Sequence, residues 1–440
     1  FWLKVQARAA RSSSLLHMAS PWQPDSPWQP AGVFPLLLCW TLWASSLLLS
    51  DAGAEIAEPD VEAFYGSFST PVLENVTFEE VRDLLLRGRP LVVKDGARGL
   101  EMSKWTCDFV RESFPDSRIR QEGGRSDVNG VKMSSDWTSS KSQFPAAAGF
   151  PEGAPKNRPF YWDIAKAFQD EPHRKWGKDP GQVVKKLVAA SAVPYFLPKQ
   201  NPRRMGASSE MWFHPPGAGA PAHMDPHCET TVSFCFSGQR RWRMMVPPAE
   251  PHREGYFDGH VYGAHDPSRN GEWQPTFEFD APEGSAVVVY PGMVHETRST
   301  GSVCSSSISQ TFQLPVAAAY YRAFWPRFSL IHEDVGRCGD LVEEMVTLGS
   351  GRGVPAAKPK KARAAAEEFA GSVDADGDGT ISEAELRQAN RGKRRMLEEL
   401  VSFHDVDGDG KVTKTELVDS WLMYAAAQLR VQVRQRRGEL

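Results

Sequence analysis

The order of apolar and polar positions divides the chain into stretches of different periodicity. An uncharged apolar run covers residues 33–50. Apolar residues three and four positions apart then follow Thr77, which predicts a helix, and Pro90–Val93 begins a strand. From Met211 to Pro315, runs of β-branched and aromatic residues alternate with Gly and Pro, which is typical of short strands. Beyond residue 362 the periodicity is again helical, around two acidic loops.

Capping residues and local periodicity predict where individual helices begin and end. Thr77 and Glu80 have the spacing of a capping box, and Gly88 is placed to end the helix that it begins. Further helices are expected at 105–114, 182–191 and 317–330. The polar stretch 121–153, rich in Gly, Ser and Lys, is expected to be a surface loop.

The β region contains several separate strand signals. We expect strands at 229–236, 241–246, 276–279, 286–290 and 305–314. Short strands at this spacing predict a sandwich or a barrel. The mouth of a barrel is a common place for a metal and a small ligand.

Two histidines and one aspartate in this region have the chemistry of an iron site. His223 and Asp225 are two residues apart, so in an extended strand their side chains point to the same face. His295 follows the apolar strand predicted at 286–290. Two histidines and a carboxylate that leave open coordination positions form the facial triad of non-haem Fe(II) oxygenases. The candidate catalytic and iron-binding residues are therefore His223, Asp225 and His295.

Other polar residues of this region are not expected to bind the metal. Glu296 should point to the face opposite His295, because neighbouring residues in a strand alternate. Four other histidines stand in loop-like sequence and are expected at the surface or as caps; they are His214, His252, His260 and His265.

The ordered motifs of this region resemble those of the Jumonji C family of cupin-like oxygenases. The similar segments are 212–225, Gly238–Trp242, Pro247–Pro248 and 284–295, and the resemblance covers residues 60–335. It implies a mainly β double-stranded β-helix (a jelly roll) with flanking helices. It also implies Fe(II) and the cosubstrate 2-oxoglutarate, which reacts with O2 to give succinate and CO2 while a C–H bond is hydroxylated.

The resemblance also assigns residues to the cosubstrate. Arg240 stands where the family has a lysine that binds the distal carboxylate, and arginine can bind a carboxylate bidentately; Arg241 is the alternative. The family's threonine three residues before the first histidine is Ala220 here. Thr231 and Gln310 match positions of polar residues near the metal, although hydrogen bonding within a strand explains them equally well.

Two acidic loops near the C-terminus match the EF-hand pattern in full. Both have carboxylates at positions 1, 3 and 5, Gly at 6, an apolar residue at 8 and Glu at 12. The predicted calcium ligands are Asp374, Asp376, Asp378, Thr380, Ser382 and Glu385 in one loop and Asp405, Asp407, Asp409, Lys411, Thr413 and Glu416 in the other. We expect a small all-α EF-hand pair at 363–430, after a linker at 349–362, with helices at 362–373, 383–404 and 417–430.

The N-terminal segment, residues 1–54, indicates entry into the secretory pathway. The apolar run 33–50 is followed by Ala52-Gly-Ala54, which fits a signal cleavage site, so a cleaved signal peptide and a retained membrane anchor are both open. Asn75-Val-Thr77 is an N-glycosylation sequon, and the last four residues resemble an endoplasmic-reticulum retention signal. The expected location is the endoplasmic reticulum, lumenal or membrane-anchored, with secretion as the alternative.

Charge and cysteine content argue against nucleic-acid-binding proteins and against proteins with CxxC motifs. A net charge of −4 gives no electrostatic case for a nucleic-acid partner. The six cysteines form no CxxC pair, which argues against a zinc ribbon or a thioredoxin motif. Spacing allows a disulfide between Cys107 and Cys338 without establishing it, whereas Cys228 and Cys235 are expected to be buried packing residues.

Three hypotheses about function follow from these features. The first is a secretory-pathway Fe(II)/2-oxoglutarate oxygenase that hydroxylates a protein side chain and carries a calcium-binding module. The second is a non-catalytic calcium-binding scaffold with a vestigial cupin barrel, which Ala220 and the replacement of lysine by Arg240 favour. The third is a lysine demethylase, which the N-terminal apolar run and the sequon oppose because they indicate a secretory protein.

Overall fold

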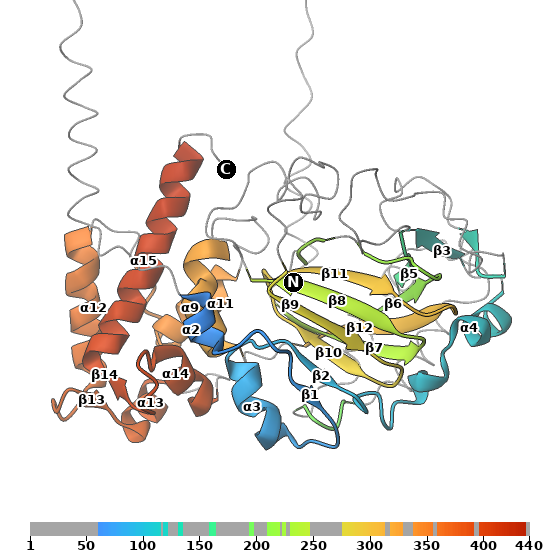
Figure 1. Cartoon of the computed structure of the whole chain (residues 1–440). Coiled ribbons are helices and arrows are strands. Elements are labelled where there is room, and N and C mark those ends of the chain that lie inside the picture. The colour runs from blue at the N-terminus through green and yellow to red at the C-terminus, as the bar shows by residue number, and fades with distance from the viewer. Residues whose placement is uncertain are drawn as a thin grey trace, which may run out of the picture. The chain divides into compact units, whose positions relative to one another are not determined.

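The chain folds into a mixture of helices and β-sheets (Figure 1), seen in a computed structural model of all 440 residues. The structure describes residues 60–115, 118–121, 131–134, 158–163, 193–197, 209–220, 222–225, 229–246, 275–312, 317–328, 338–354, 359–390 and 396–436. These residues all belong to one compact unit, Ala54–Leu440. The predicted signal run, the helix expected at 182–191 and the C-terminal tetrapeptide lie outside the described residues.

A large mixed sheet forms the centre of this unit. Within the described residues its strand order is β1-β2-β10-β7-β12-β6-β5-β3-β4, and all neighbours pair antiparallel except β1 and β2. The strands are β1 (Val72–Leu73), β2 (Leu91–Val93), β3 (Arg118–Gln121), β4 (Val131–Lys132), β5 (Phe160–Asp163), β6 (Ser209–His214), β7 (Thr230–Ser237), β10 (Ala286–Val289) and β12 (Ser305–Phe312).

A second, smaller sheet lies against the large one (Figure 1). In it β8 (Arg240–Met245) lies between β9 (Phe277–Ala281) and β11 (Val294–Ser299). Neither sheet closes on itself within the described part of the chain, so the predicted barrel or sandwich is represented there by two open sheets.

The chain passes from the large sheet to the small one directly after β6. Residues 218, 220 and 223 pair antiparallel with the free edge of β11, with backbone hydrogen bonds from Ser299 to Ala218 (2.8 Å) and from Thr297 to Ala220 (3.0 Å). Gly219 permits this close approach, because a Cβ there would lie 1.7 Å from the carbonyl oxygen of Thr297. The edge of β11 therefore receives the segment that carries His223.

The strand predictions are confirmed with small shifts of their ends, but several further strands were not predicted. β7, β8, β9, β10 and β12 correspond to the five predicted strands. β11 was not predicted, because its sequence Val-His-Glu-Thr-Arg-Ser is almost wholly polar. Nor were β1, β3, β5 and β6 among the predicted strands. β4 lies within the stretch expected to be a surface loop, so that prediction was wrong for residues 131–132.

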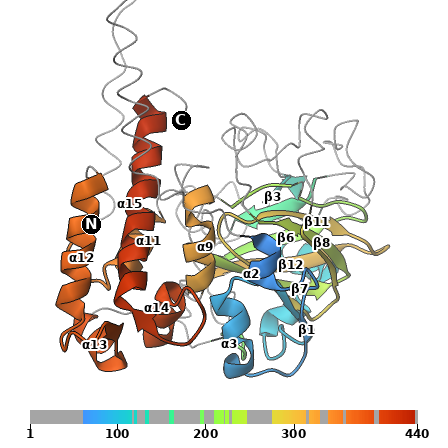
Figure 2. The ribbon, with the colours of Figure 1, turned by 60° about the vertical axis from the view of Figure 1, so that its left-hand side comes forward.

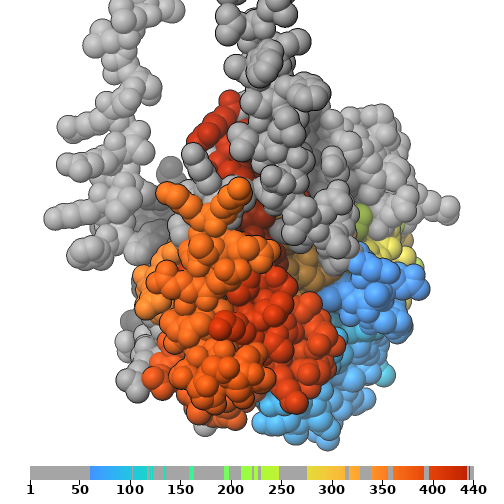
Figure 3. Space-filling model, turned by 90° about the vertical axis from the view of Figure 1, so that its left-hand side faces the viewer, coloured from blue at the N-terminus to red at the C-terminus, as the bar shows by residue number. Residues whose placement is uncertain are grey.

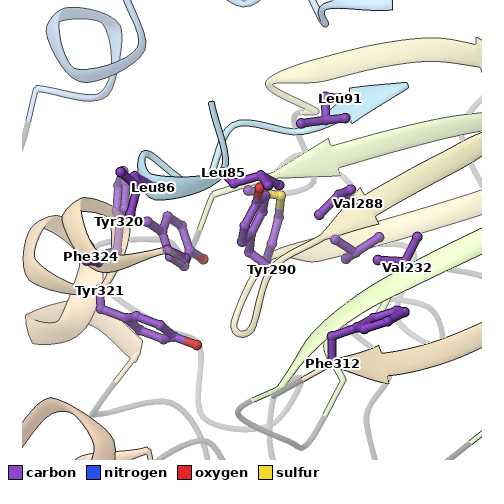
Figure 4. Packing of buried hydrophobic residues seen from close by; sticks show 14 of the residues in the cluster. Leu85, Leu86, Leu91, Val232, Val288, Tyr290, Phe312, Tyr320, Tyr321 and Phe324 are labelled. Atoms are coloured by element: carbon purple, nitrogen blue, oxygen red, sulfur yellow. The ribbon is translucent and has the colours of Figure 1, made fainter. Parts of the chain in front are cut away.

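Helices cover the apolar face of the large sheet (Figure 4). α3 (Phe78–Leu86) begins with the predicted capping box of Thr77 and Glu80. Together with α9 (Ala318–Phe328) it packs buried side chains on strand residues of this face, whereas α2 (Val61–Tyr65) contacts α9 and, through Tyr65, Phe277 of β9. They include Leu85, Tyr320 and Phe324 from the helices and Val232, Val288 and Phe312 from the strands.

The opposite face of the large sheet is polar and points toward the small sheet. Ser309 pairs with Ser233 in the register of β12 and β7, and their hydroxyl oxygens are 3.4 Å apart. Ser305 pairs with His214 and Ser307 pairs with Trp212 in the register of β12 and β6. Buried serine and histidine side chains thus line the space between the sheets, where an apolar core would be usual.

The C-terminal region is helical, as predicted, and lies beside α9 (Figure 2). It contains α11 (Gly339–Val346), α12 (Pro359–Val373), α13 (Glu383–Ala389), α14 (Leu397–His404) and α15 (Lys414–Arg436). The continuous helix predicted at 383–404 was wrong: Asn390 ends α13 and Met396 precedes α14. The predicted linker also ends early, because α12 begins at Pro359. α4 (Cys107–Ser113) and α9 match the remaining helix predictions.

A disulfide joins the start of α4 to the residue before β12. Cys107 is bonded to Cys304, so the pairing of Cys107 with Cys338 was wrong, although Cys338 is disulfide-bonded as well. Cys235 is a free, buried thiol, as expected of a packing residue. In the part of the chain that the structure describes, no helix is long and apolar enough to cross a membrane.

Candidate metal centres

Backbone pairing brings the two histidines of the predicted triad together. His223 and His295 form an antiparallel bridge, in which the amide of His223 donates to His295 O (3.0 Å) and the amide of His295 donates to His223 O (2.8 Å). Directly paired residues project from the same face of a sheet. The imidazole rings accordingly lie with their centroids 4.3 Å apart.

Asp225 completes the cluster from the same segment as His223. Its Oδ1 lies 3.7 Å from Nε2 of His223 and 4.0 Å from Nε2 of His295. One potential ligand atom from each of the three side chains lies within 4.8 Å of the others. The structure therefore brings together the three residues that the sequence singled out.

Two hydrogen bonds orient the ligand atoms toward a common point. Nδ1 of His295 lies 3.1 Å from Met293 O, which leaves Nε2 facing Asp225. The Thr231 hydroxyl donates to Oδ2 of Asp225 at 3.5 Å, which leaves Oδ1 facing the histidines. Thr231 thus holds the Asp225 carboxylate in place; the resemblance implied a polar residue near the metal at this position but not this contact with Asp225.

The donor set fits a divalent transition metal. Imidazole nitrogens suit iron, copper and zinc, and two histidines with one carboxylate leave three positions of an octahedron open. Ligands bonded to one ion at right angles are about 3 Å apart at bond lengths of about 2.1 Å. The separations of Asp225 Oδ1 from the two Nε2 atoms, 3.7 and 4.0 Å, exceed this value by about 1 Å at most. Asp225 is the most exposed of the three, with 26 % of its side chain exposed.

Arg240 lies on the inner face of the small sheet. In the register of β8 and β11, Met244 pairs with His295 and Trp242 with Thr297, so Arg240 projects from the same face as His295. The Trp242 ring lies 6.0 Å from the His295 ring, and the Arg240 guanidinium carbon lies 5.3 Å from the Trp242 ring. One aromatic side chain therefore spans the interval between the triad and this cation.

The Arg240 guanidinium is buried with little to neutralise it. Only 2 % of the residue is exposed, and burial lowers the pKa of its guanidinium. Nη2 donates to the Ser233 hydroxyl (2.9 Å), Nε has no hydrogen-bond partner, and no described carboxylate forms an ion pair with it. A buried cation is unfavourable unless it is paired. Its surroundings therefore favour an anionic ligand.

His214 was predicted to be a surface or capping residue, and this was wrong. It is the last residue of β6, 1 % exposed, and its side chain shares the inner face with Ser305. Burial lowers the pKa of its imidazole well below the usual range, and Arg240 lowers it further, so the ring is neutral. Unpartnered polar atoms gather here: Nδ1 of His214, Nε1 of Trp242 and the hydroxyls of Ser299, Ser305 and Ser307.

The remaining predicted residues lie elsewhere. Gln310 pairs with Val232, on the face opposite Thr231, and is not brought to the triad. Arg241 projects outward, 49 % exposed, and binds Asp280 through Nε at 3.0 Å and Nη2 at 3.1 Å. Glu296 points away from the triad, as expected, and accepts a hydrogen bond from Nε of Arg243 (2.8 Å). His252, His260 and His265 lie outside the described residues.

The two acidic loops of the C-terminal region form a pair. β13 (Thr380–Ile381) and β14 (Val412–Thr413) pair antiparallel, with Ile381 opposite Val412. Gly379 and Gly410 at position 6 have φ of 84° and 82°, which only glycine adopts without strain. Both side chains of the Ile381–Val412 pair are buried.

The carboxylates of each loop converge. Asp374, Asp376 and Asp378 offer oxygen atoms within 4.8 Å of one another, as do Asp405, Asp407 and Glu416. An EF-hand family model matches residues 372–389 and 403–419. The C-terminal region is thus a calcium-binding EF-hand region. The family model matches no residues outside these two segments, and a comparison with curated proteins found no match for the chain.

Inside the EF-hand region the last ligand of each loop is held by the backbone. Glu385 accepts hydrogen bonds from the amides of Ser382 (2.8 Å) and Ala375 (2.6 Å), and Glu416 accepts from Thr413 (2.7 Å) and Val406 (2.7 Å). The hydrogen bond from the Ser382 amide is the largest cause lowering the pKa of Glu385. Both glutamates are therefore ionised and ready to bind a cation.

Proposed function

We propose that the protein is an Fe(II)- and 2-oxoglutarate-dependent oxygenase of the secretory pathway that hydroxylates a protein side chain and carries calcium-binding EF-hands. The convergence of His223, Asp225 and His295 is the observation that carries this proposal. The two open sheets would be the halves of a double-stranded β-helix, with the triad between them.

The triad residues would hold Fe(II) through Nε2 of both histidines and Oδ1 of Asp225. Bound iron would supply the redox chemistry in which O2 oxidises 2-oxoglutarate to succinate and CO2 and delivers one oxygen atom to a C–H bond. Thr231 and the Met293 carbonyl keep the ligand atoms oriented, so the protein needs little rearrangement to bind the metal.

Arg240 would bind the distal carboxylate of the cosubstrate. The guanidinium lies one aromatic side chain away from His295, which is about the reach of a five-carbon dicarboxylate. The hydroxyl missing at Ala220 has a counterpart on β11: Oγ1 of Thr297 lies 3.3 Å from the Ala220 amide, and the two residues pair across the strand edge. We propose that Thr297 replaces that hydroxyl.

The compartment is supported by two observations on the described residues. A disulfide such as Cys107–Cys304 persists in oxidising compartments. Asn75, the acceptor of the sequon, is exposed at the protein surface. The proposed location is therefore the endoplasmic reticulum, lumenal or membrane-anchored.

Anaerobic titration tests the proposal independently of the unknown substrate. Fe(II) and 2-oxoglutarate added to the full chain should produce the visible charge-transfer band of the ternary complex, and O2 should then release succinate in a single turnover. Both signals should be lost in His223→Ala. Iron binding without the band or succinate would instead support a non-catalytic calcium-binding scaffold with a vestigial barrel.

A further inference from the structure

The two EF-hand loops differ in what neutralises their first ligand. Asp405 accepts three backbone amides of its own loop, from Gly408 (2.8 Å), Asp409 (3.1 Å) and Gly410 (2.9 Å). Asp374, its equivalent, accepts one amide, from Gly379, at 3.5 Å. Its second oxygen, Oδ2, instead lies 3.4 Å from Nζ of Lys414, a residue of the other loop. In the metal-free protein, the carboxylate at position 1 of the first loop is therefore already paired with the ammonium of Lys414.

Backbone pairing holds Lys414 in this place. Lys414 directly follows β14, and its amide donates to Gly379 O (3.0 Å), which extends the β13–β14 ladder into the first loop. The side chain lies across the last turn of α12, where a Cβ added to Gly371 would be 3.6 Å from Nζ. The C-terminal end of a helix attracts a cation. Two features besides Asp374 therefore keep the ammonium at the first loop.

The two loops have the same ligand pattern, but the contact between them runs in one direction only. The residue of the first loop that corresponds to Lys414 is Glu383, which bonds Arg387 on its own helix through Nε (2.9 Å). The second loop therefore receives no cation from the first loop in exchange. Arg322 of α9 lies at its position 1, but its guanidinium donates to the backbone oxygen of Asp405 and not to the carboxylate. Figure 3 shows α12 in orange and α15 in red side by side on the molecular surface. The Asp374 side chain is 1 % exposed and that of Lys414 is 43 % exposed, so the ammonium can leave for solvent.

We propose that Lys414 is a built-in competitor of calcium at the first EF-hand site. To bind at this site, calcium must displace the Lys414 ammonium from Asp374, and the ammonium then repels the bound ion at short range. The first site therefore binds calcium more weakly than the second, and the residue responsible belongs to the second loop. This inference rests on the EF-hand loops alone and is independent of the proposed oxygenase.

Calcium titration of the full chain by isothermal calorimetry tests the inference. Asp405→Asn disables the second site and isolates the first. On this background Lys414→Gln should tighten calcium binding about three- to tenfold, the effect of removing one competing ion pair and its charge. Lys414→Arg, which keeps the charge, should change the affinity less than about twofold.

Lys411→Gln is the matched control. It removes the same charge from the same loop. As position 7 of that loop Lys411 would bind calcium through its backbone carbonyl, which the substitution keeps, and its amide bonds Asp409 of its own loop. On the Asp405→Asn background it should leave the first site within about twofold. Equal gains from Lys411→Gln and Lys414→Gln would reduce the effect to general electrostatics and overturn the inference. So would an unchanged affinity in Lys414→Gln when circular dichroism shows the metal-free variant to be folded.

Discussion

At the scale of single residues, neighbouring arginines in β8 have opposite surroundings. Arg240 is buried beside His214 and Ser233, whereas Arg241 is half exposed and bonded to Asp280. Alternation along the strand separates the two cations by face. Only one of them can serve a ligand between the sheets, and the burial of Arg240 makes it costly to leave unpaired.

Arg240→Met should weaken 2-oxoglutarate binding by about 100-fold, since a charge-assisted, buried hydrogen bond contributes about 3 kcal/mol. Arg241→Met should leave the affinity within about twofold, because an exposed ion pair contributes little. Titration of the iron-loaded variants followed by the charge-transfer band gives both constants. Equal losses in the two variants would contradict the assignment.

Adjacent threonines of β7 provide a second residue-scale prediction. Thr231 bonds Asp225, whereas Thr230 projects to the opposite face and its buried hydroxyl has no partner. Thr231→Val should lower the affinity for Fe(II) about tenfold, the usual cost of losing a hydrogen bond to a metal ligand. The isosteric control Thr230→Val should bind Fe(II) like the unchanged protein in the same anaerobic titration. An affinity retained in Thr231→Val would remove Thr231 from the site.

At the scale of elements, one strand edge assembles the candidate iron site. β11 pairs with residues 218, 220 and 223 on one edge and with β8 on the other, and the His295 ring contacts the rings of His223 and Trp242. Gly219 allows the first of these pairings because no side chain intervenes. The disulfide between Cys107 and Cys304 attaches α4 at the beginning of β12, the neighbour of β6 and β7.

Loss of that disulfide should destabilise the fold. It closes a loop of 197 residues, and cross-links over such distances restrict the unfolded chain and stabilise proteins by about 4 kcal/mol. Cys107→Ser, Cys304→Ser and the double variant should each lose about this amount in denaturant unfolding. The three losses should be alike, because either substitution breaks the bond. Additive losses would show that the two cysteines act separately.

At the scale of the whole molecule, α9 joins the sheets to the EF-hand region. The Tyr320 hydroxyl donates to Pro291 O (2.7 Å), in the loop before β11, and the Trp325 ring stacks on Tyr424 of α15. Arg322 donates through Nη1 to Phe403 O (3.0 Å) and to Asp405 O, and so caps the C-terminal end of α14. A helix that packs on the sheets thus supports the second calcium loop.

Arg322→Met should lower the free energy of unfolding by about 2 kcal/mol, since it leaves partly buried carbonyl oxygens at the end of α14 without this donor. It should also weaken calcium binding at the second loop, whose first residue loses its support. Arg363→Met, an exposed change on α12 with a long ion pair to Glu367, should have little effect on either. Chemical denaturation with and without calcium measures both quantities. Wild-type stability in Arg322→Met would contradict this role.

The sequence by itself determined the features whose interactions are local. Both calcium loops could be predicted because all their ligands lie within twelve consecutive residues. The Thr77 capping box and the shared face of His223 and Asp225 likewise depend on spacings of two or three residues. Helical and strand periodicities placed most of the elements, except polar strands such as β11, whose residues carry no apolar alternation.

Only the tertiary structure decided which distant residues meet. The bridge of His223 with His295, the burial of His214, the choice of Arg240 over Arg241 and the partner of Cys107 all depend on strand register and on the packing of the two sheets. The contact of Lys414 with the other calcium loop depends in the same way on the β13–β14 ladder. Register is set by the sum of many pairings, so no short stretch of sequence encodes it.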